Sequence, residues 1–230
     1  MPNQKASREA IQALSAISYF ANLDAATLES IAQTMQRQNY QAGQIIFLGG
    51  EACTGLYIIE TGWVKAVKFS ANGREQVLHF LGPGEALNMV GVLSGSVNPA
   101  TAIALEATTA WIVRQEQILG LSEDYPELAR MIIQDLAKRI HYLIGLIEDL
   151  SLRSVEARLA RFLLEQASEG VVHRQRWATQ AELAARLGTV PDVLNRALTS
   201  LTEAGLIQVE RRQIDLLDAS GLAAKAAQEE

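Results

Sequence analysis

The chain has 230 residues, a formal net charge of −6 and a single cysteine, Cys53. That length exceeds the roughly 100–150 residues usual for one domain, so we expect two domains. One cysteine excludes an intramolecular disulfide bond and an iron–sulfur cluster held by about four thiolates. The sequence lacks an apolar run of about 20 residues and an apolar leader, so we expect no membrane partner and a cytoplasmic location.

The N-terminal part changes its hydrophobic period near residue 40. We expect residues 1–10 to be loosely ordered, and helical spacing from Ile11 to Gln38 predicts short helices with Asp24 as an N-cap. Beyond Gly43 the pattern consists of short apolar or alternating runs, at residues 44–48, 56–60, 63–69, 75–81, 100–105 and 109–113. Glycines and the hairpin pair Asn72-Gly73 separate these runs. We therefore predict an antiparallel β-roll and assign residues 1–125 to that domain.

A long amphipathic helix is predicted for residues 126–150, starting at Pro126. Its apolar residues follow three- and four-residue steps for more than six turns, well beyond the mean helix length of about 11 residues. A stripe of this length needs a cover, and a twin helix from a second subunit is the simplest one. The alternative is packing on its own β-roll. The residues that we expect at the dimer face are Leu136, Ile140, Leu143, Ile147 and Leu150.

Residues 178–207 carry the pattern of a helix-turn-helix. Thr179 followed by Glu182 is a capping box that begins the first helix. Gly188 provides the turn, and Pro191 stands at a first helical position, where its missing N–H costs little. These local features predict a DNA-binding motif whose second helix enters the major groove.

The second helix of this motif has a polar side that faces away from its leucines. Side chains there can hydrogen-bond to base edges, and we predict base contacts from Asp192, Asn195, Arg196 and Thr199. Arg196 is the strongest candidate because a guanidinium can form two hydrogen bonds to guanine. The alternative is that Arg196 only forms an ion pair with Asp192 four residues earlier on an exposed face.

Residues 151–218 are predicted to form the complete winged domain. Ser151 to Ser154 breaks the long helix and forms a hinge, and Ser154 caps the next helix. Residues 206–209 and 213–217 predict a hairpin wing with Arg211 and Arg212 at its tip, either as phosphate contacts or merely as solvated side chains. We expect the Ala-rich tail, residues 219–230, to fray.

The distribution of charge bears on DNA binding, because phosphate neutralisation supplies much of the affinity of DNA-binding proteins. Residues 1–150 carry 10 basic and 15 acidic side chains, whereas residues 151–218 carry nine of each. The excess of acid therefore lies mainly outside the predicted winged domain. We expect only modest sequence-independent binding to DNA.

The order of these parts resembles that of the CRP/FNR family of bacterial transcription regulators. The resemblance runs from about Leu14 to Leu217. It rests on four motifs, namely Tyr19-Phe20-Ala21-Asn22-Leu23, Gly43-Gln44-Ile45-Ile46-Phe47, the segment from Gly55 to Lys65, and Gly82-Pro83-Gly84-Glu85. It implies an α+β fold with an N-terminal β-roll sensor domain, a long dimerisation helix and a C-terminal winged helix-turn-helix.

The resemblance also implies partners and contacts. Such proteins are usually homodimers in which a small molecule in the sensor domain re-aims both DNA-binding domains, a two-state switch driven by differential affinity. The implied partners are a second copy of the chain, a near-palindromic DNA operator and RNA polymerase. The implied phosphate contacts are Thr179, Gln180, Arg211 and Arg212. Pro191 stands where cyclic AMP-responsive members have arginine, so their target sequence does not carry over.

Cyclic nucleotide sites in this fold use Gly-Glu-Leu and, after a loop, Arg-Ser or Arg-Thr. The corresponding stretches of this chain are Asn88-Met89-Val90 and Asn98-Pro99-Ala100-Thr101, and our predicted effector pocket comprises Asn88, Met89, Pro99 and Ala100. Both charged residues are missing, and a buried phosphate without a counter-charge costs several kcal/mol, so we do not expect cyclic AMP to bind. An apolar or weakly polar effector near Asn88, Met89 and the inner face of the long helix, or no effector, remains open, and Met89 and Trp63 also fit ordinary core or surface positions.

Haem stays open as a cofactor because His79 lies in the β-roll and His141 on the long helix, although no pair has diagnostic spacing. We find no motif for nucleotide hydrolysis, nucleophilic catalysis or catalytic metal binding, so we do not expect an enzyme. The leading hypothesis is a homodimeric, sequence-specific transcription regulator. The alternative is a ligand-binding or scaffolding dimer whose winged helix mediates protein contacts.

Overall fold

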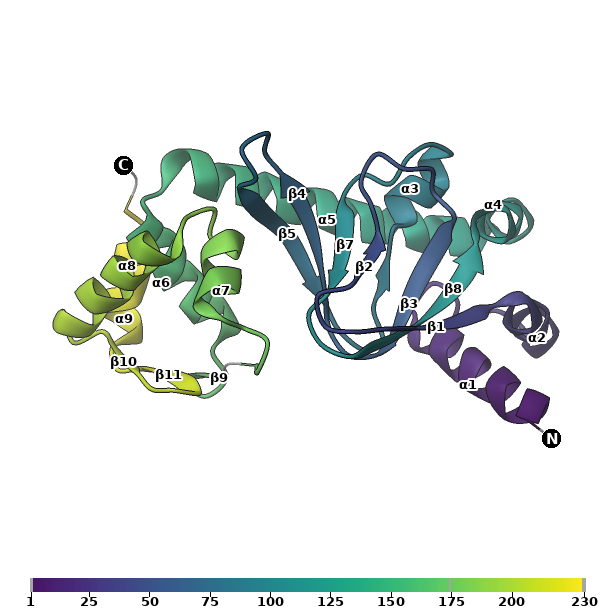
Figure 1. The fold of residues 1–230 in the computed structure, drawn as a ribbon, viewed down its shortest axis with the longest axis horizontal. Coiled ribbons are helices and arrows are strands. Elements are labelled where there is room, and N and C mark those ends of the chain that lie inside the picture. The colour runs from purple at the N-terminus through teal and green to yellow at the C-terminus, as the bar shows by residue number, and fades with distance from the viewer. Residues whose placement is uncertain (1, 174, 229–230) are drawn as a thin grey trace. The chain divides into compact units, whose positions relative to one another are not determined.

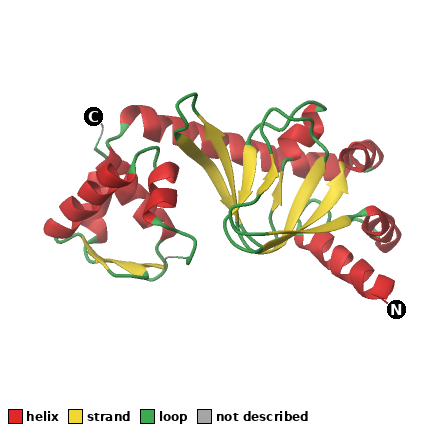
Figure 2. Ribbon diagram, viewed as in Figure 1, coloured by secondary structure: helices red, strands yellow, loops and turns green. Residues whose placement is uncertain are grey.

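The computed structural model describes residues 2–173 and 175–228 and divides the chain into two compact units (Figure 1). The first unit comprises the chain up to residue 68 together with residues 78–139, and the second comprises residues 69–77 and 140–230. Figure 2 shows that strands dominate the first unit and short helices the second. The predicted α+β class is confirmed.

The strands of the N-terminal part form two antiparallel sheets. Their bounds are β1 Gln36–Tyr40, β2 Ile45–Phe47, β3 Gly55–Thr61, β4 Val64–Phe69, β5 Glu75–Leu81, β6 Ala86–Leu87, β7 Thr101–Ala104 and β8 Thr108–Arg114. One sheet has the order β1-β8-β3-β6 and the other β2-β7-β4-β5. Gly73, with φ +80°, turns the β4–β5 hairpin, and its N–H donates to the carbonyl of Ser70 at 2.9 Å. The predicted β-roll is confirmed.

Strand β3 shows why the roll is well determined by its sequence. Side chains alternate between the faces of a strand. Tyr57 and Ile59 belong to the cluster inside the roll, where the Phe47 and Tyr57 rings lie 5.1 Å apart. Leu56 and Ile58 belong to a second cluster, to which the helices of the unit contribute. Both faces are buried from Gly55 to Ile59, so this part of the strand is apolar, and the polar Glu60 and Thr61 follow where the strand leaves the core.

The helices of the N-terminal part are α1 Pro2–Ala16, α2 Ala25–Thr34, α3 Met89–Ser94 and α4 Gln115–Asp124, followed by the long α5 Pro126–Leu152. Asp24 caps α2 as predicted, because its carboxylate accepts a hydrogen bond from the N–H of Thr27 at 2.9 Å. The expectation of loose order in residues 1–10 is wrong for residues 2–10, which lie in α1. Buried Ala10 and Leu14 attach this helix to the core.

The C-terminal unit is a winged helix-turn-helix with an additional helix. Its elements are α6 Val155–Gln166, β9 Val171–His173, α7 Gln180–Arg186, α8 Pro191–Glu203, β10 Ile207–Val209, β11 Gln213–Leu216 and α9 Ala219–Ala226. Its sheet has the order β10-β11-β9. Ser154 caps α6 as predicted, accepting from the N–H of Ala157 at 3.2 Å. Leucines of α6 and α8, including Leu159 and Leu201, form its core.

Helix α9 corrects the expectation of a fraying tail. Leu222 is fully buried in the core of the C-terminal unit. Glu156 of α6 accepts hydrogen bonds from Ser200 of α8 at 3.0 Å and contacts the ammonium of Lys225 in α9 at 2.8 Å. One carboxylate thus connects three helices, and Ala219–Ala226 is a structural part of the domain.

Candidate nucleic-acid interface and sensor segments

Three local features position the helix-turn-helix. The hydroxyl of Thr179 accepts a hydrogen bond from the N–H of Glu182 at 3.2 Å, which caps α7. Gly188 has a φ of +65°, a conformation that costs glycine little, and Thr189 donates to the carbonyl of Ala184 at 2.9 Å across the turn. Pro191 is the first residue of α8. The sequence pattern therefore predicted both helices and the turn correctly.

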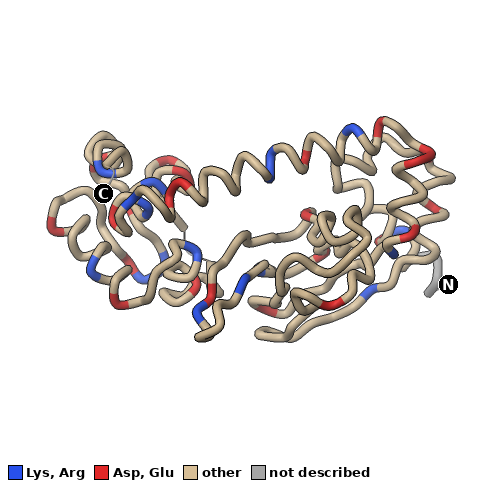
Figure 3. The backbone as a smooth tube through the Cα atoms, turned by 90° about the horizontal axis from the view of Figure 1, so that it is seen from above, with Lys and Arg blue, Asp and Glu red and all other residues tan. Residues whose placement is uncertain are grey.

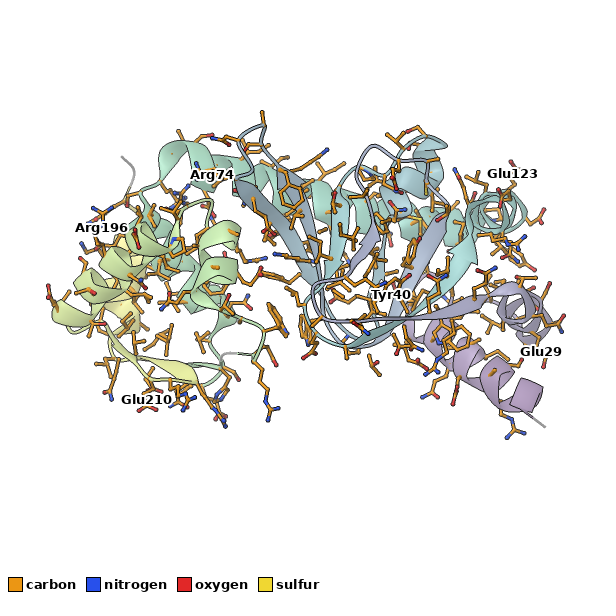
Figure 4. The ribbon with its side chains drawn as sticks, viewed as in Figure 1. Glu29, Tyr40, Arg74, Glu123, Arg196 and Glu210 are labelled. Carbon is orange, nitrogen blue, oxygen red and sulfur yellow. The ribbon has the colours of Figure 1, made fainter. Side chains whose placement is uncertain are left out.

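Helix α8 separates an apolar face from a polar one. Its buried residues are Leu194, Ala197, Leu198 and Leu201. The four residues predicted to contact bases are all exposed, namely Asp192, Asn195, Arg196 and Thr199. Figure 4 labels Arg196 on this helix. The four lie within eight positions of the helix N-terminus, the end that recognition helices direct at base edges.

Arg196 has no ion pair or hydrogen bond among the described residues, and none joins it to Asp192. Other arginines of the same unit are engaged, since Arg153 and Arg161 both contact the carboxylate of Asp149, at 3.1 and 2.9 Å. Figure 3 shows the basic and acidic positions interspersed along this unit. The exposed guanidinium of Arg196 is therefore available to an external partner.

The wing brings two more arginines to an exposed tip. Strands β10 and β11 pair with Val209 opposite Ile214, and Glu210 donates its N–H to the carbonyl of Gln213 at 2.9 Å. Arg211 and Arg212 fill the connecting turn beside Glu210, which Figure 4 labels. Both are exposed, and neither forms an ion pair among the residues that the structure describes.

The start of α7 differs in detail from the sequence expectation. Thr179 is exposed, but its hydroxyl oxygen already accepts the capping hydrogen bond, so a phosphate contact would use the hydroxyl hydrogen. Gln180 is half-buried, and its Oε1 atom is buried without a hydrogen-bond partner within the described part of the chain. Sequence reasoning missed Arg176, which precedes α7, is exposed and has no ion pair among those residues. An arginine in a loop belongs to no periodic pattern that could have indicated its role.

In the N-terminal unit, the side chain of Asn88 connects three segments of the roll. Asn88 has a left-handed backbone, with φ +77°. Its amide Nδ2 lies 3.1 Å from the carbonyl oxygen of Gly55, 2.9 Å from Oδ1 of Asn98 and 3.2 Å from Sγ of Cys53. Asn98, only 3% exposed, donates from its own amide to the carbonyl of Leu48 at 3.0 Å. We call Asn88, Asn98 and Cys53 the Asn88 cluster.

The other predicted pocket residues differ in their burial. Met89 and Ala100 are each 7% exposed, and Met89 belongs to the core shared with the helices, whereas Pro99 is exposed. A cavity of about 500 Å³ does adjoin Cys53. None of the four predicted residues lines it; its walls are Gln36, Gln38, Cys53, Thr54, Tyr57, Ile112, Arg114 and Glu116.

The surroundings of Cys53 and Glu85 in the roll shift the pKa values of both side chains. Burial raises the pKa of the Cys53 thiol, which opposes formation of a reactive thiolate. His79 Nε2 lies 3.9 Å from Oε1 of Glu85, and hydrogen bonding from His79 is the main cause that lowers the pKa of Glu85. Within residues 2–173 and 175–228, no group of three or more His, Cys, Asp or Glu side chains is placed to hold a metal ion.

Each of the two halves of the chain matches a known protein family. Residues 37–125 match the family model of the cyclic nucleotide-binding domain, and residues 157–225 match that of the Crp-like helix-turn-helix domain. The chain is 31% identical over 195 residues to the cyclic AMP receptor protein of Thermus thermophilus, covering 82% of this chain and 90% of that protein.

Solved structures show the same fold. A transcriptional regulator of the CRP/FNR family from Eubacterium rectale has a TM-score of 0.71 and 25% identity, covering 93% of this chain and 100% of that one. FixK2 from Bradyrhizobium japonicum has a TM-score of 0.74 and 23% identity, covering 85% and 98%. In the described residues, no helix is both long and apolar enough to cross a membrane. The chain belongs to the CRP/FNR family of DNA-binding transcription regulators.

Proposed function

We propose that this protein is a homodimer that binds a near-palindromic operator and contacts bases through Asp192, Asn195, Arg196 and Thr199. The observation that carries the proposal is the exposed polar face of α8, where Arg196 has no partner among the described residues. A guanidinium can donate two hydrogen bonds to guanine, a carboxylate can accept from cytosine and a carboxamide can pair with adenine.

Phosphate contacts supply the affinity that is independent of sequence. Arg211 and Arg212 at the wing and Arg176 before α7 are exposed cations, and Thr179 and Gln180 can each donate one hydrogen bond. Three cations from each of two subunits would neutralise about six phosphates, which predicts a slope of log K against log salt concentration of about −5. Winged helices that mediate only protein contacts have no reason to give such a slope.

The exposed side of α5 supports the homodimer. Ile133, Ile140, Ile144 and Ile147 are 65%, 58%, 56% and 64% exposed, and they recur at the spacing of a two-helix seam. Of the five residues predicted for the dimer face, Ile140 and Ile147 lie on this stripe. Leu136, Leu143 and Leu150 are half-buried instead. A second copy of α5 would cover the stripe with an identical one.

The residues of the sensor segments support the proposal that the effector is not a cyclic nucleotide. In this structure a methionine side chain packed into the core, Met89, stands where the family's nucleotide sites place glutamate, and Pro99 and Ala100 replace the arginine and its polar neighbour. An anionic phosphate there would lack a counter-charge, a cost of several kcal/mol. The amide of Asn88, which replaces a glycine, already occupies the space between these segments with its own hydrogen bonds.

The proposed regulator therefore responds to an effector other than cyclic AMP or to none. Its single thiol cannot hold an iron–sulfur cluster. Haem ligation by His79 would compete with the contact to Glu85. We further propose that the protein acts in the cytoplasm, where bacterial DNA lies, that it works together with RNA polymerase, and that it is a regulator and not an enzyme.

Operator selection tests the proposal. The purified protein is incubated with a random duplex library in the absence of any nucleotide, and the affinity for the selected duplex is then measured by fluorescence anisotropy against salt. We expect an inverted repeat, a slope near −5 and no change in affinity on adding cyclic AMP. Selection that succeeds only with cyclic AMP would refute the sensor part of the proposal. Failure to select any sequence would instead favour a scaffolding dimer.

A further inference from the structure

An apolar residue lies exposed immediately before the recognition helix. Val190 is 47% exposed and is the N-cap of α8, and the exposed Pro191 follows it. Exposed isolated apolar residues are common on protein surfaces. This pair differs because it directly precedes Asp192, in the segment whose side chains are proposed to face the base edges.

Folding does not account for valine at this position. N-caps are usually Ser, Thr, Asp or Asn, whose side chains accept a hydrogen bond from the first helical turn, and valine is among the poorest. The side chain of Val190 makes no such bond. It also does not belong to the core of the C-terminal unit, which is built from residues such as Leu194 and Leu198. Valine therefore neither caps the helix nor adds to the core.

The major groove offers one apolar group that such a side chain can recognise, the C5 methyl of thymine. The isopropyl group of Val190 cannot hydrogen-bond to a base or a phosphate, and Pro191 has no N–H to donate. We infer that Val190, supported by Pro191, contacts the methyl group of a thymine in each operator half-site. This inference rests on the proposed function. It means that the residue before the recognition helix selects a thymine in the operator through an apolar contact.

Replacing thymine with uracil removes only the methyl group and leaves all hydrogen-bonding groups in place. The selected operator is therefore synthesised with a symmetric pair of uracils at each thymine position in turn, and the affinities are compared at one salt concentration. For the wild type we expect a loss of about fourfold per half-site at one position, the factor for one buried methyl group, hence about 15-fold for the pair.

The variants Val190→Ala and Val209→Ala complete the test, since Val209 is also exposed, at 39%, but lies in the wing. Val190→Ala should bind the thymine and uracil operators equally, while Val209→Ala should keep the full penalty. Circular dichroism confirms that both variants are folded. Equal wild-type affinities for every uracil operator, or an unchanged penalty in Val190→Ala, would overturn the inference while leaving DNA binding intact.

Two other outcomes are also decisive. Two further duplexes carry cytosine or 5-methylcytosine in place of that thymine, and they differ only in the methyl group. If the wild type binds the 5-methylcytosine duplex more tightly than the cytosine duplex and Val190→Ala does not, the contact is with the methyl group, as inferred. If the wild type selects no operator at all, the proposed function itself fails, and the inference fails with it.

Discussion

The buried side chain of Asn98 offers the sharpest test of how the sensor segments are held together. Asn98 accepts a hydrogen bond from Asn88 at 2.9 Å and donates one to the carbonyl of Leu48 at 3.0 Å. Its own backbone N–H and carbonyl also pair with the loop at residues 50–51. The substitution Asn98→Ala removes the two side-chain hydrogen bonds and leaves the backbone ones unchanged.

The magnitude follows from what the substitution leaves behind. The carbonyl of Leu48 loses a partner, but Leu48 is 40% exposed and water can replace the lost donor, so the cost is that of a typical hydrogen bond, about 0.5–1.5 kcal/mol. The amide of Asn88 loses one acceptor but keeps the carbonyl of Gly55, so its loss is that of a typical hydrogen bond, about 0.5–1.5 kcal/mol. We expect Asn98→Ala to lower the free energy of unfolding of the N-terminal unit by about 1–3 kcal/mol, the sum of two such hydrogen bonds.

The control is Asn39→Ala, which removes an exposed asparagine of β1 whose Oδ1 accepts from Thr109 at 2.9 Å. Urea denaturation of both variants is followed by the fluorescence of Trp63 and Trp111, the two tryptophans of the N-terminal unit, in a background with Trp177→Phe. We expect Asn39→Ala to stay within about 0.5 kcal/mol of its parent, as surface substitutions usually do. Equal stabilities for the two variants would refute the role given to the Asn88 cluster.

Three further predictions concern the dimer stripe of α5, the N-cap of α6 and the ion pair between α6 and α9. Ile140→Glu should shift the sedimentation coefficient from dimer to monomer, while Arg130→Glu on the same helix should not; a dimeric Ile140→Glu would count against the proposed seam. Ser154→Ala removes the N-cap of α6 and should cost about 1 kcal/mol in urea denaturation; an unchanged midpoint would argue against that cap. Hydrogen bonding with Lys225 lowers the pKa of Glu156, so its stabilisation is present above the unfolded value near 4.5 and is lost as the pH falls through the lower folded value. Glu156→Gln should therefore be less stable by about 0.5–1 kcal/mol at pH 7, because the pair is partly solvated, and the difference should shrink steadily as the pH falls below 4.5; a difference that stays constant in acid would contradict this.

The parts of the fold that the sequence predicted are those with local causes. Thr179, Gly188 and Pro191 each act within one helical turn, so the helix-turn-helix followed from their spacing. The alternating strands of the roll were predicted for the same reason. Strand β1 was missed because Gln36–Tyr40 is polar and four of its five residues are exposed.

The features that the sequence did not predict depend on contacts between residues that are distant in sequence. Nothing local indicates that the amide of Asn88 meets the side chain of Asn98 and the carbonyl of Gly55. Helix α5 has apolar residues on more than one side, so periodicity gives the helix but not which stripe its own domain covers. Leu136 packs against the core of the N-terminal unit, whereas Ile144, which the sequence reasoning omitted, is exposed. Helix α9 was missed because its docking through Leu222 is a tertiary contact.

The central claim is that the exposed face of α8 determines the DNA sequence that this protein binds. The most direct measurement is the affinity of Arg196→Ala for every single-base-pair change in one half-site of the selected operator. Arg130→Ala, which removes an exposed arginine of α5, is the matched control. We predict that Arg196→Ala loses about 1–3 kcal/mol on the selected operator and its preference at one base-pair position, while Arg130→Ala matches the wild type. An Arg196→Ala variant with the complete wild-type base preference would contradict the account.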